Sequence, residues 1–337
     1  MTKILFILKK RNIYSDGTYS NVDSGLQNSA RFVNDMLVKN KVDSTLVQVV
    51  DNNEIDKYCA KHKPDVVIIE ALWVVPSKFE ILKKLHPNIT WIIRLHSELP
   101  FLANEGIAIE WLKEYVKYDN VLIGSNSNFL IDALSPYLGT NIIYLPNYYK
   151  VTGKKPIIRE NQHGVINVGI FGAIRPMKNS LTQAVAAINY ANANNLKLRL
   201  HINSARVEQK GENVLKNLRA LFVDTRHELI EHGWLKHQDF VKLVGTMDIC
   251  LQVSISETYN IVAADVVNQR VPVVTTDEIP FVNYFSSVNS NKNVKNIIDT
   301  MRLNLRFKTV LTILNKFYLY VNSKRAKMVW LKFVNNF

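Results

Sequence analysis

Short apolar segments alternate with helix-like segments along most of this chain, and this alternation constrains the fold more than any other feature. An apolar run at residues 4–8 is followed by residues 25–39, where apolar side chains recur on one helix face. Strands that alternate with helices form parallel sheets covered on both faces. The further predicted strands of this half are residues 45–50, 64–69, 90–95, 121–124 and 141–145.

The pattern breaks at residues 148–164, a Gly- and Pro-containing segment expected to be a linker, and then starts again. We therefore predict an α/β protein of two Rossmann-like, doubly wound domains, residues 1–150 and 151–300, with a helical tail at 301–337 that packs back on the first domain. In open α/β sheets, ligands bind outside the carboxyl ends of the strands. The expected site is a central cleft that the two domains face.

The charge of the chain is concentrated at its C-terminal end. The formal net charge is +13, and residues 301–337 contain eight basic residues, several aromatic residues and no acidic residue. A charge block of this kind indicates a partner. Three interpretations stay open: a helix with solvated cations, an anionic membrane surface, or nucleic acid phosphates.

Several classes of protein are excluded or disfavoured. Two cysteines, Cys59 and Cys250, are too few for a disulfide scaffold or a Cys-rich zinc site, and we expect Cys250 to be buried. The longest apolar stretch, residues 66–75, falls short of the ~20 residues that a membrane span needs. We expect a cytoplasmic protein, at most peripheral at the membrane. P-loop, His-Glu-x-x-His, Gly-x-Ser-x-Gly and dinucleotide-fingerprint motifs are absent from the sequence.

The most informative segment joins a predicted strand ending near Val253 to a helix expected to begin near Thr258. Backbone amides at a helix start can hold an anion. Glu257 and Asp265 are eight residues apart, which would put both carboxylates on one helix face, ~11–12 Å apart along the axis. Such a pair suits two hydroxyl-bearing parts of one extended ligand, such as two sugar rings.

A basic pair, Arg175 and Lys178, follows the predicted strand at 165–171 after a glycine-containing turn. A planar guanidinium and a compact ammonium together suit a diphosphate.

These two segments resemble the donor-binding motifs of retaining GT-B glycosyltransferases of the GT4-like group. The resemblance implies that Glu257 holds the sugar and Asp265 the ribose of a nucleotide-sugar, while Arg175 and Lys178 hold its diphosphate without a metal ion. The family usually has Glu where this chain has Asp265, and often Gly where it has Asn260. Asn tolerates unusual backbone angles better than most residues.

The resemblance also implies further site residues. His96 corresponds to a position near the reacting sugar, Glu98 to the acceptor side, and residues 145–147 to the domain junction. Gly25, in the segment that starts at Asp23, opens a helix whose amides would face the diphosphate. The remaining donor-binding candidates are Trp234 and Leu235 near the base, and the loop residues Ser256, Thr258, Tyr259 and Asn260.

The implied activity is transfer of a hexosyl or pentosyl group from a nucleotide-diphosphate sugar to an acceptor hydroxyl, with retention of configuration and without a cofactor. The acceptor is expected to be either a hydroxymethylated DNA base of a phage or a cell-envelope glycan or lipid. The basic tail would hold the polyanionic acceptor surface, whether DNA or anionic membrane. A nucleotide-sugar epimerase and a non-catalytic nucleotide-sugar-binding protein remain alternatives.

Overall fold

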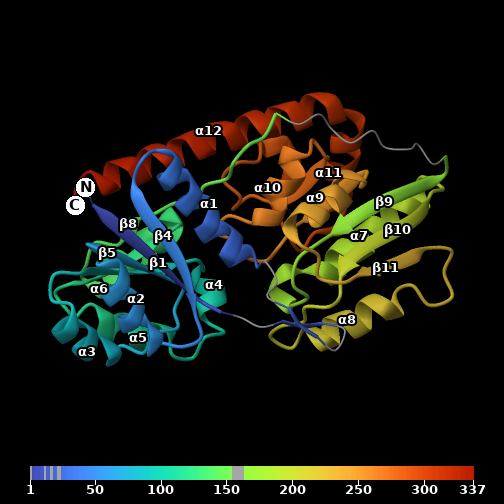
Figure 1. Cartoon of the computed structure of the whole chain (residues 1–337). Helices are drawn as coiled ribbons and strands as arrows, with labels where there is room; N and C mark the ends of the chain where they lie inside the picture. Colours follow the sequence, from blue (N-terminus) through green and yellow to red (C-terminus); the bar gives the residue numbers. More distant parts are fainter. Residues whose placement is uncertain (1, 11–12, 16–17, 21–23, 154–162) are drawn as a thin grey trace. The chain divides into compact units, whose positions relative to one another are not determined.

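The computed structural model describes residues 2–10, 13–15, 18–20, 24–153 and 163–337. Asp23 and residues 154–162, which belong to the predicted linker, lie outside the described residues. The chain forms two compact units (Figure 1). Unit 1 comprises Met1–Asn12, Ser24–Lys150 and Ser323–Phe337, and unit 2 comprises Ile13–Asp23 and Val151–Asn322.

Unit 1 is built on a six-stranded parallel sheet with helices between the strands. The strands are β1 (Lys3–Lys9), β4 (Asp43–Val49), β5 (Val66–Glu70), β6 (Thr90–Leu95), β7 (Val121–Ser125) and β8 (Ile143–Tyr144). The helices are α1 (Gly25–Lys39), α2 (Glu54–His62), α3 (Lys78–Leu85), α4 (Leu99–Leu102), α5 (Ala108–Tyr115) and α6 (Asn128–Leu138). The strand order is β4-β1-β5-β6-β7-β8, and every pairing is parallel.

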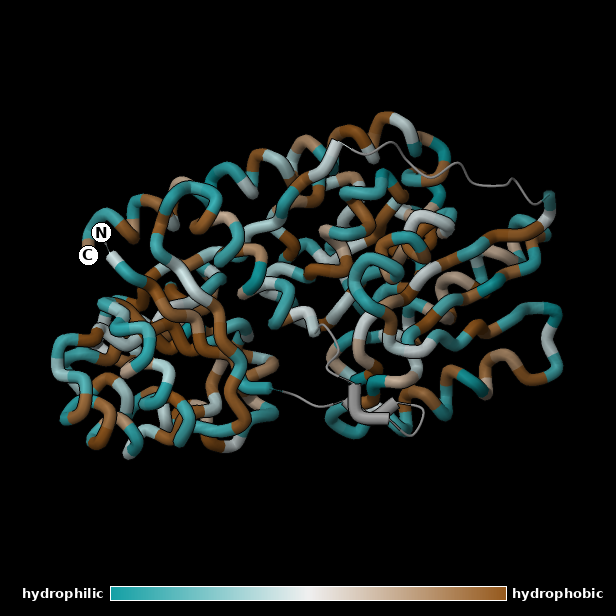
Figure 2. The backbone as a smooth tube through the Cα atoms, in the orientation of Figure 1, coloured by the Kyte–Doolittle hydropathy of each residue, from teal (hydrophilic) through white to brown (hydrophobic). Residues whose placement is uncertain are grey.

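Successive side chains of each strand point to opposite faces of this sheet. Both faces are buried, each in a core of its own. Ile4 and Phe6 of β1 belong to a core with α1 and the C-terminal helix. Leu5 and Ile7 belong to a second core with α2, α3, α5 and α6. In Figure 2 these strands contain runs of hydrophobic residues, drawn in brown.

Unit 2 is built on a second six-stranded parallel sheet. The strands are β9 (Val165–Ile170), β10 (Lys197–Asn203), β11 (Glu228–His232), β12 (Ile249–Gln252), β13 (Val273–Thr276) and β14 (Ser287–Val288). The helical segments are η1 (Pro176–Lys178), α7 (Ser180–Ala193), α8 (Gly211–Ala220), α9 (His237–Gly245), α10 (Ile261–Asn268), η2 (Tyr284–Ser286) and α11 (Val294–Arg306). The strand order is β11-β10-β9-β12-β13-β14, all parallel.

Each sheet has one point where the strand order reverses. In unit 2 this point lies between β9 and β12, and in unit 1 it lies between β1 and β5. The connections from the two adjacent strands leave toward opposite faces there, which opens a crevice at the carboxyl ends of the strands. The two reversals therefore identify where each unit can hold a ligand.

The predicted architecture of two parallel α/β sheets and a helical tail is confirmed. Two local predictions are wrong. Part of the predicted polar loop after the first strand forms an antiparallel pair, β2 (Ile13–Ser15) and β3 (Thr18–Ser20). The helix expected to begin near Thr258 begins at Ile261. Cys59 and Cys250 are both buried, as expected for Cys250.

The tail consists of α11 and one long helix, α12 (Lys308–Val334). Trp330 near its end is fully buried in unit 1, 5.8 Å from the Phe6 ring, and its indole N–H donates to the Pro146 carbonyl oxygen at 2.7 Å. This contact ties the last turns of α12 to the first strand and to the segment that follows β8. Among the described residues, no helix is long and apolar enough to cross a membrane.

Replacing Trp330 with Ala is expected to destabilise unit 1 by about 3–5 kcal/mol, because the substitution removes a large buried side chain and leaves a cavity. Urea unfolding followed by circular dichroism measures this loss. Met328, one half-turn away and 62% exposed, is the control, and Met328→Ala should change stability by less than about 0.5 kcal/mol. Equal effects of the two substitutions would contradict this packing of α12.

Candidate functional site

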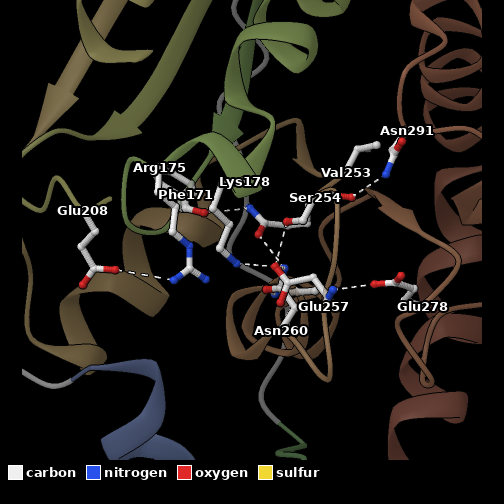
Figure 3. A network of polar contacts seen from close by, with 12 residues as sticks. Phe171, Arg175, Lys178, Glu208, Val253, Ser254, Glu257, Asn260, Glu278 and Asn291 are labelled. Carbon is white, nitrogen blue, oxygen red and sulfur yellow. Dashed lines mark hydrogen bonds and ion pairs between the residues drawn. The ribbon is translucent and has the colours of Figure 1, made fainter. Parts of the chain in front are cut away.

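The loops that follow β9 and β12 meet at the point of strand-order reversal in unit 2 (Figure 3). The backbone N–H of Ile255 donates to the Met177 carbonyl oxygen at 2.9 Å. The Asn179 side-chain amide donates to the Val253 carbonyl oxygen at 3.1 Å. These hydrogen bonds hold the two loops in a fixed register, so the side chains that they carry are brought together.

An ion pair between Lys178 and Glu257 joins these loops, and Nζ of Lys178 donates to Oε1 of Glu257. Both side chains are largely buried, 16% and 10% exposed. The same carboxylate oxygen accepts hydrogen bonds from Ser254 Oγ at 2.7 Å and from Asn260 Nδ2 at 3.2 Å. The Glu257 backbone N–H donates to Glu278 at 2.5 Å. Glu257 is therefore held by side chains from several loops at one sheet edge.

The electrostatics of this pair favour the charged carboxylate. Burial raises the pKa of Glu257, but the charges of Lys178 and Arg175 and its hydrogen bonds outweigh burial and bring the pKa below its ordinary value. Burial also lowers the pKa of Lys178, and the neighbouring Arg175 lowers it further, while Glu257 opposes both effects. Both cations are already paired with carboxylates, so a bound anion would take the place of Glu257 beside Lys178 or of Glu208 beside Arg175.

Arg175 extends the cationic cluster toward β10. Its guanidinium lies 3.6 Å from the Glu208 carboxylate, which also accepts from Arg206 at 2.7 Å. The Arg206 guanidinium in turn lies 4.9 Å from the centre of the half-buried Trp234 ring. Arg175, Lys178 and Arg206 thus follow two neighbouring strands, with Trp234 beside them, at the carboxyl edge of the sheet.

The backbone beneath this cluster adopts conformations that few residues tolerate. Gly172 has a φ of +121°, and a Cβ atom there would lie 3.8 Å from Lys178 Cε. Asn260 has a φ of +61°, which confirms that its position requires an unusual backbone angle. Its side chain caps α10 by accepting from the Ala263 N–H at 2.9 Å. Asn260 therefore combines a turn that favours glycine with a helix cap and a contact to Glu257.

The two acidic residues of the motif do not share a helix face, and that prediction is wrong. Because Asn260 takes a left-handed conformation, α10 begins at Ile261 and Glu257 stays in the preceding loop. Asp265 lies within α10, is 1% exposed, and its carboxylate is 2.8 Å from Nε2 of His237. His237, which the sequence reading did not single out, thus engages the second acidic position directly.

The remaining donor-side candidates differ in their surroundings. Tyr259 is buried with its ring 4.8 Å from Phe281, so its side chain belongs to the core. Ser256, Thr258 and Leu235 are half-buried in the loops at this sheet edge.

A second polar cluster lies in unit 1 at the ends of β5 and β6. Glu70 is fully buried and accepts from Arg94 at 2.9 Å, and its other oxygen contacts His96 Nε2. Burial raises the pKa of Glu70, but the charge of Arg94 and the hydrogen bonds from His96 and Arg94 outweigh burial and lower it, so the carboxylate is ionised. An ionised carboxylate only accepts hydrogen bonds, so His96 carries its proton on Nε2. Burial and Arg94 lower the pKa of His96 and keep the ring neutral.

Arg94 also connects this cluster to residues 145–147, which follow β8. Its guanidinium donates to the carbonyl oxygens of Leu145 at 3.0 Å and Pro146 at 3.1 Å and to the Asn147 side chain at 2.7 Å. Residues 145–147, predicted from the resemblance to form the domain junction, are thereby fixed to the strand that precedes His96.

His96 and Glu70 line a small pocket at the strand-order reversal of unit 1. Ala71, which follows β5 in this lining, has a φ of +70°. A non-glycine residue in the left-handed region costs free energy and is often found at functional sites. The other lining residues are Lys9, Leu26, Leu72, Trp73, Leu95, Ser97, Leu102 and Glu105.

The other two candidates of unit 1, Glu98 and Gly25, are each next in the chain to a residue that lines this pocket, Ser97 and Leu26 respectively. Glu98 is buried, accepts a hydrogen bond from the Ser127 hydroxyl, and burial raises its pKa. Gly25 is the first residue of α1, directly after Ser24, which caps the helix by accepting from the Gln27 N–H at 3.1 Å.

Sequence reasoning missed Glu70, Arg206, Glu208 and His237. Each lies at or shortly after the carboxyl end of a strand, except that His237 begins the helix after β11. Glu70 also stands out as a single acid in an apolar strand that is buried on both faces. Such an acid needs a buried partner, and in the structure this partner is Arg94.

Comparison with solved structures shows the same architecture in glycosyltransferases. The chain aligns with sucrose-phosphate synthase from Thermosynechococcus elongatus at a TM-score of 0.71 and 11% identity, over 99% of this chain and 98% of that one. It aligns with HepE from Anabaena, solved with UDP and glucose, at 0.64 and 10% identity, over 100% and 99%. This chain has the GT-B fold.

A third similar structure is TarM from Staphylococcus aureus, a variant solved with fondaparinux, alpha-GlcNAc-glycerol and UDP. The TM-score is 0.61 at 16% identity, and the alignment covers 83% of this chain but only 58% of the TarM chain. No family model matches the sequence, and no curated protein matches it.

The backbone at Asn260 gives a test of the local geometry. Asn260→Ala should destabilise unit 2 by roughly 1–3 kcal/mol, because it loses the cap and retains a Cβ at a positive φ. Asn260→Gly should be more stable than Asn260→Ala by about 1 kcal/mol. Urea unfolding measures both differences.

Asn217, exposed in the middle of α8, is the matched control. There the order should reverse, with Ala more stable than Gly by about 1 kcal/mol, because glycine is unfavourable inside a helix. The same order at both positions would contradict the left-handed conformation of Asn260.

Proposed function

We propose that this chain is a glycosyltransferase that moves a hexosyl or pentosyl group from a nucleotide-diphosphate sugar to an acceptor hydroxyl, with retention of configuration. The observation that carries the proposal is the meeting of Arg175, Lys178 and Glu257 at the strand-order reversal of unit 2. Similar chains have been solved with UDP. UDP-glucose is therefore the first donor to test.

Two cationic side chains of the site would stabilise the leaving group of the reaction. Arg175 and Lys178 would bind the donor diphosphate and stabilise the negative charge that grows on it as the glycosidic bond breaks. The backbone amides that begin α10 and the adjacent loop residues Ser256 and Thr258 would add hydrogen-bond donors. Two fixed cations can do this without a divalent ion, so no metal or cofactor is proposed.

Glu257 would orient the transferred sugar through its hydroxyls once the diphosphate takes over Lys178. Trp234, beside Arg206, and Leu235 would contact the nucleotide base. Asp265 would act on the ribose together with His237, which holds its carboxylate.

Unit 1 would contribute the acceptor side of the reaction. His96 is held by Glu70 through Nε2 and would contact a hydroxyl near the reacting carbon. Glu98 is a weaker candidate, because its carboxyl already accepts from Ser127. Gly25 would place the amides of α1 toward the diphosphate.

We infer the class of acceptor from the charge of the tail. Residues 301–337, with eight bases and no acid, would bind a polyanionic surface near the acceptor, either DNA carrying a hydroxymethylated base, as in a phage, or the anionic membrane that carries an envelope glycan or lipid.

Arg175→Ala and Glu257→Gln should each lower turnover of UDP-glucose by ~100- to 1,000-fold, because each removes an interaction with the reacting centre. Release of UDP measures turnover. Arg175→Ala should also weaken UDP binding in a thermal-shift titration, whereas Glu257→Gln should keep it. Exposed residues of α8 give the controls, Glu212→Gln and Lys216→Ala, which should behave as wild type. Near-normal turnover in both Arg175→Ala and Glu257→Gln would contradict the proposal.

Removal of divalent ions tests whether Arg175 and Lys178, here called the cationic clamp, are sufficient to stabilise the leaving diphosphate. After dialysis against EDTA, turnover should stay within about twofold of the untreated enzyme, because the two cations already neutralise the leaving group. A loss of more than about tenfold that Mg²⁺ restores would show that the clamp is insufficient.

The chain departs from the family pattern at Asp265 and Asn260, and these departures are the reason for a second candidate, an epimerase or a binding protein that uses the same donor site without transfer. Incubation with a nucleotide-sugar in the absence of acceptor distinguishes these functions. An epimerised nucleotide-sugar identifies an isomerase, and tight binding without any turnover identifies a binding protein.

A further inference from the structure

The outward face of α12 is apolar, whereas the outward face of a helix on a globular protein is usually polar. Val310, Ile313, Phe317 and Tyr320 recur three or four residues apart, so they lie on one face. They are 64%, 50%, 59% and 44% exposed. The opposite face is already buried through side chains such as Leu311 and Leu319. The first four turns of α12 are thus apolar on both sides, and the described residues cover one of them.

Cations lie at both ends of this outward face. Arg306 and Lys308 precede it, and Lys324 and Arg325 follow it one turn beyond Tyr320, all four exposed. Lys316, within the stretch, points inward instead, and its ammonium donates to the Asn268 carbonyl oxygen at 2.9 Å. Residues 301–337 contain no acidic residue.

We propose that the outward face of α12 docks on an anionic lipid bilayer. Val310, Ile313, Phe317 and Tyr320 would enter the boundary between headgroups and acyl chains, and the flanking lysines and arginines would contact anionic headgroups. Aromatic side chains are favoured at this depth, because their apolar bodies and polar edges match the interface. The face and its charges have the two features that interfacial binding requires.

The same features disfavour the other two occupants. Contacts to nucleic acid are made mainly by cationic and polar groups on phosphates, and Val310, Ile313 and Phe317 offer none. A second copy of the chain would bring one basic tail against another, and like charges repel. The proposal does not depend on the transferase activity, since none of the residues of this face is among the proposed donor-site residues.

Flotation with phospholipid vesicles tests the proposal. The full chain should bind vesicles of phosphatidylcholine with phosphatidylglycerol and should bind vesicles of phosphatidylcholine alone at least about tenfold less. The double substitution Ile313→Glu with Phe317→Glu should lower binding to the anionic vesicles by about tenfold or more. Lys324→Glu with Arg325→Glu should also lower binding and reduce its sensitivity to salt.

Matched controls come from other surfaces of the chain. Phe129 is 71% exposed on α6, and Lys216 is exposed on α8. Phe129→Glu and Lys216→Glu should bind vesicles as the wild type does. All variants are checked by thermal melting, and Glu257→Gln should retain vesicle binding, so failure here is distinct from failure of the proposed activity.

Three results would overturn the proposal. Equal or absent binding to both kinds of vesicle would exclude an anionic bilayer. Binding to duplex DNA that is lost in the Lys324 and Arg325 variant but kept in the Ile313 and Phe317 variant would identify a nucleic acid surface. A dimer in light scattering that the Ile313 and Phe317 variant loses, without vesicle binding by the wild type, would identify a second copy.

Discussion

The ion pair between Lys178 and Glu257 is the contact on which the proposed donor site depends. It joins the loops after β9 and β12, which leave the sheet on either side of the strand-order reversal. Each member is buried and would be unfavourable alone, because an unpaired buried charge is strongly destabilising. A ligand that enters here must therefore supply an anion for Lys178 and polar groups for Glu257. A phosphorylated sugar supplies both.

Unit 1 uses a comparable arrangement at its own sheet edge. Glu70 and Arg94 form a buried pair. Arg94 also donates hydrogen bonds to residues 145–147, and Glu70 holds the His96 ring. Both units thus place a buried, charged pair at the carboxyl ends of parallel strands near a reversal in strand order. The sheet topology determines where such pairs are useful, because only there do loops diverge and leave space for a ligand.

Much of the fold follows from the sequence, because strands buried on both faces read as short apolar runs and the helices between them as amphipathic segments. The strands and helices were predicted to within a few residues in most cases, including α1 at residues 25–39 and β6 at 90–95. The start of α10 could not be predicted in this way. The sequence pattern predicts a helix from about Thr258, but Asn260 has a left-handed backbone conformation, so the helix begins at Ile261. A single backbone angle leaves no signal in the spacing of apolar residues.

The site was predictable where charged residues cluster in the sequence and less so where they converge from separate strands. Arg175, Lys178 and Glu257 were recognised from local motifs, and the structure brings Lys178 and Glu257 into contact across 79 residues of sequence. Arg206 and His237 depend on contacts with Trp234 and Asp265 that no local pattern encodes.

The most direct test of the donor site is a crystal structure of the chain with bound UDP. We expect the diphosphate oxygens to lie within hydrogen-bond distance of Arg175 and Lys178, with the Lys178–Glu257 pair opened. A UDP molecule bound elsewhere, with that pair intact and Arg175 still on Glu208, would contradict this expectation.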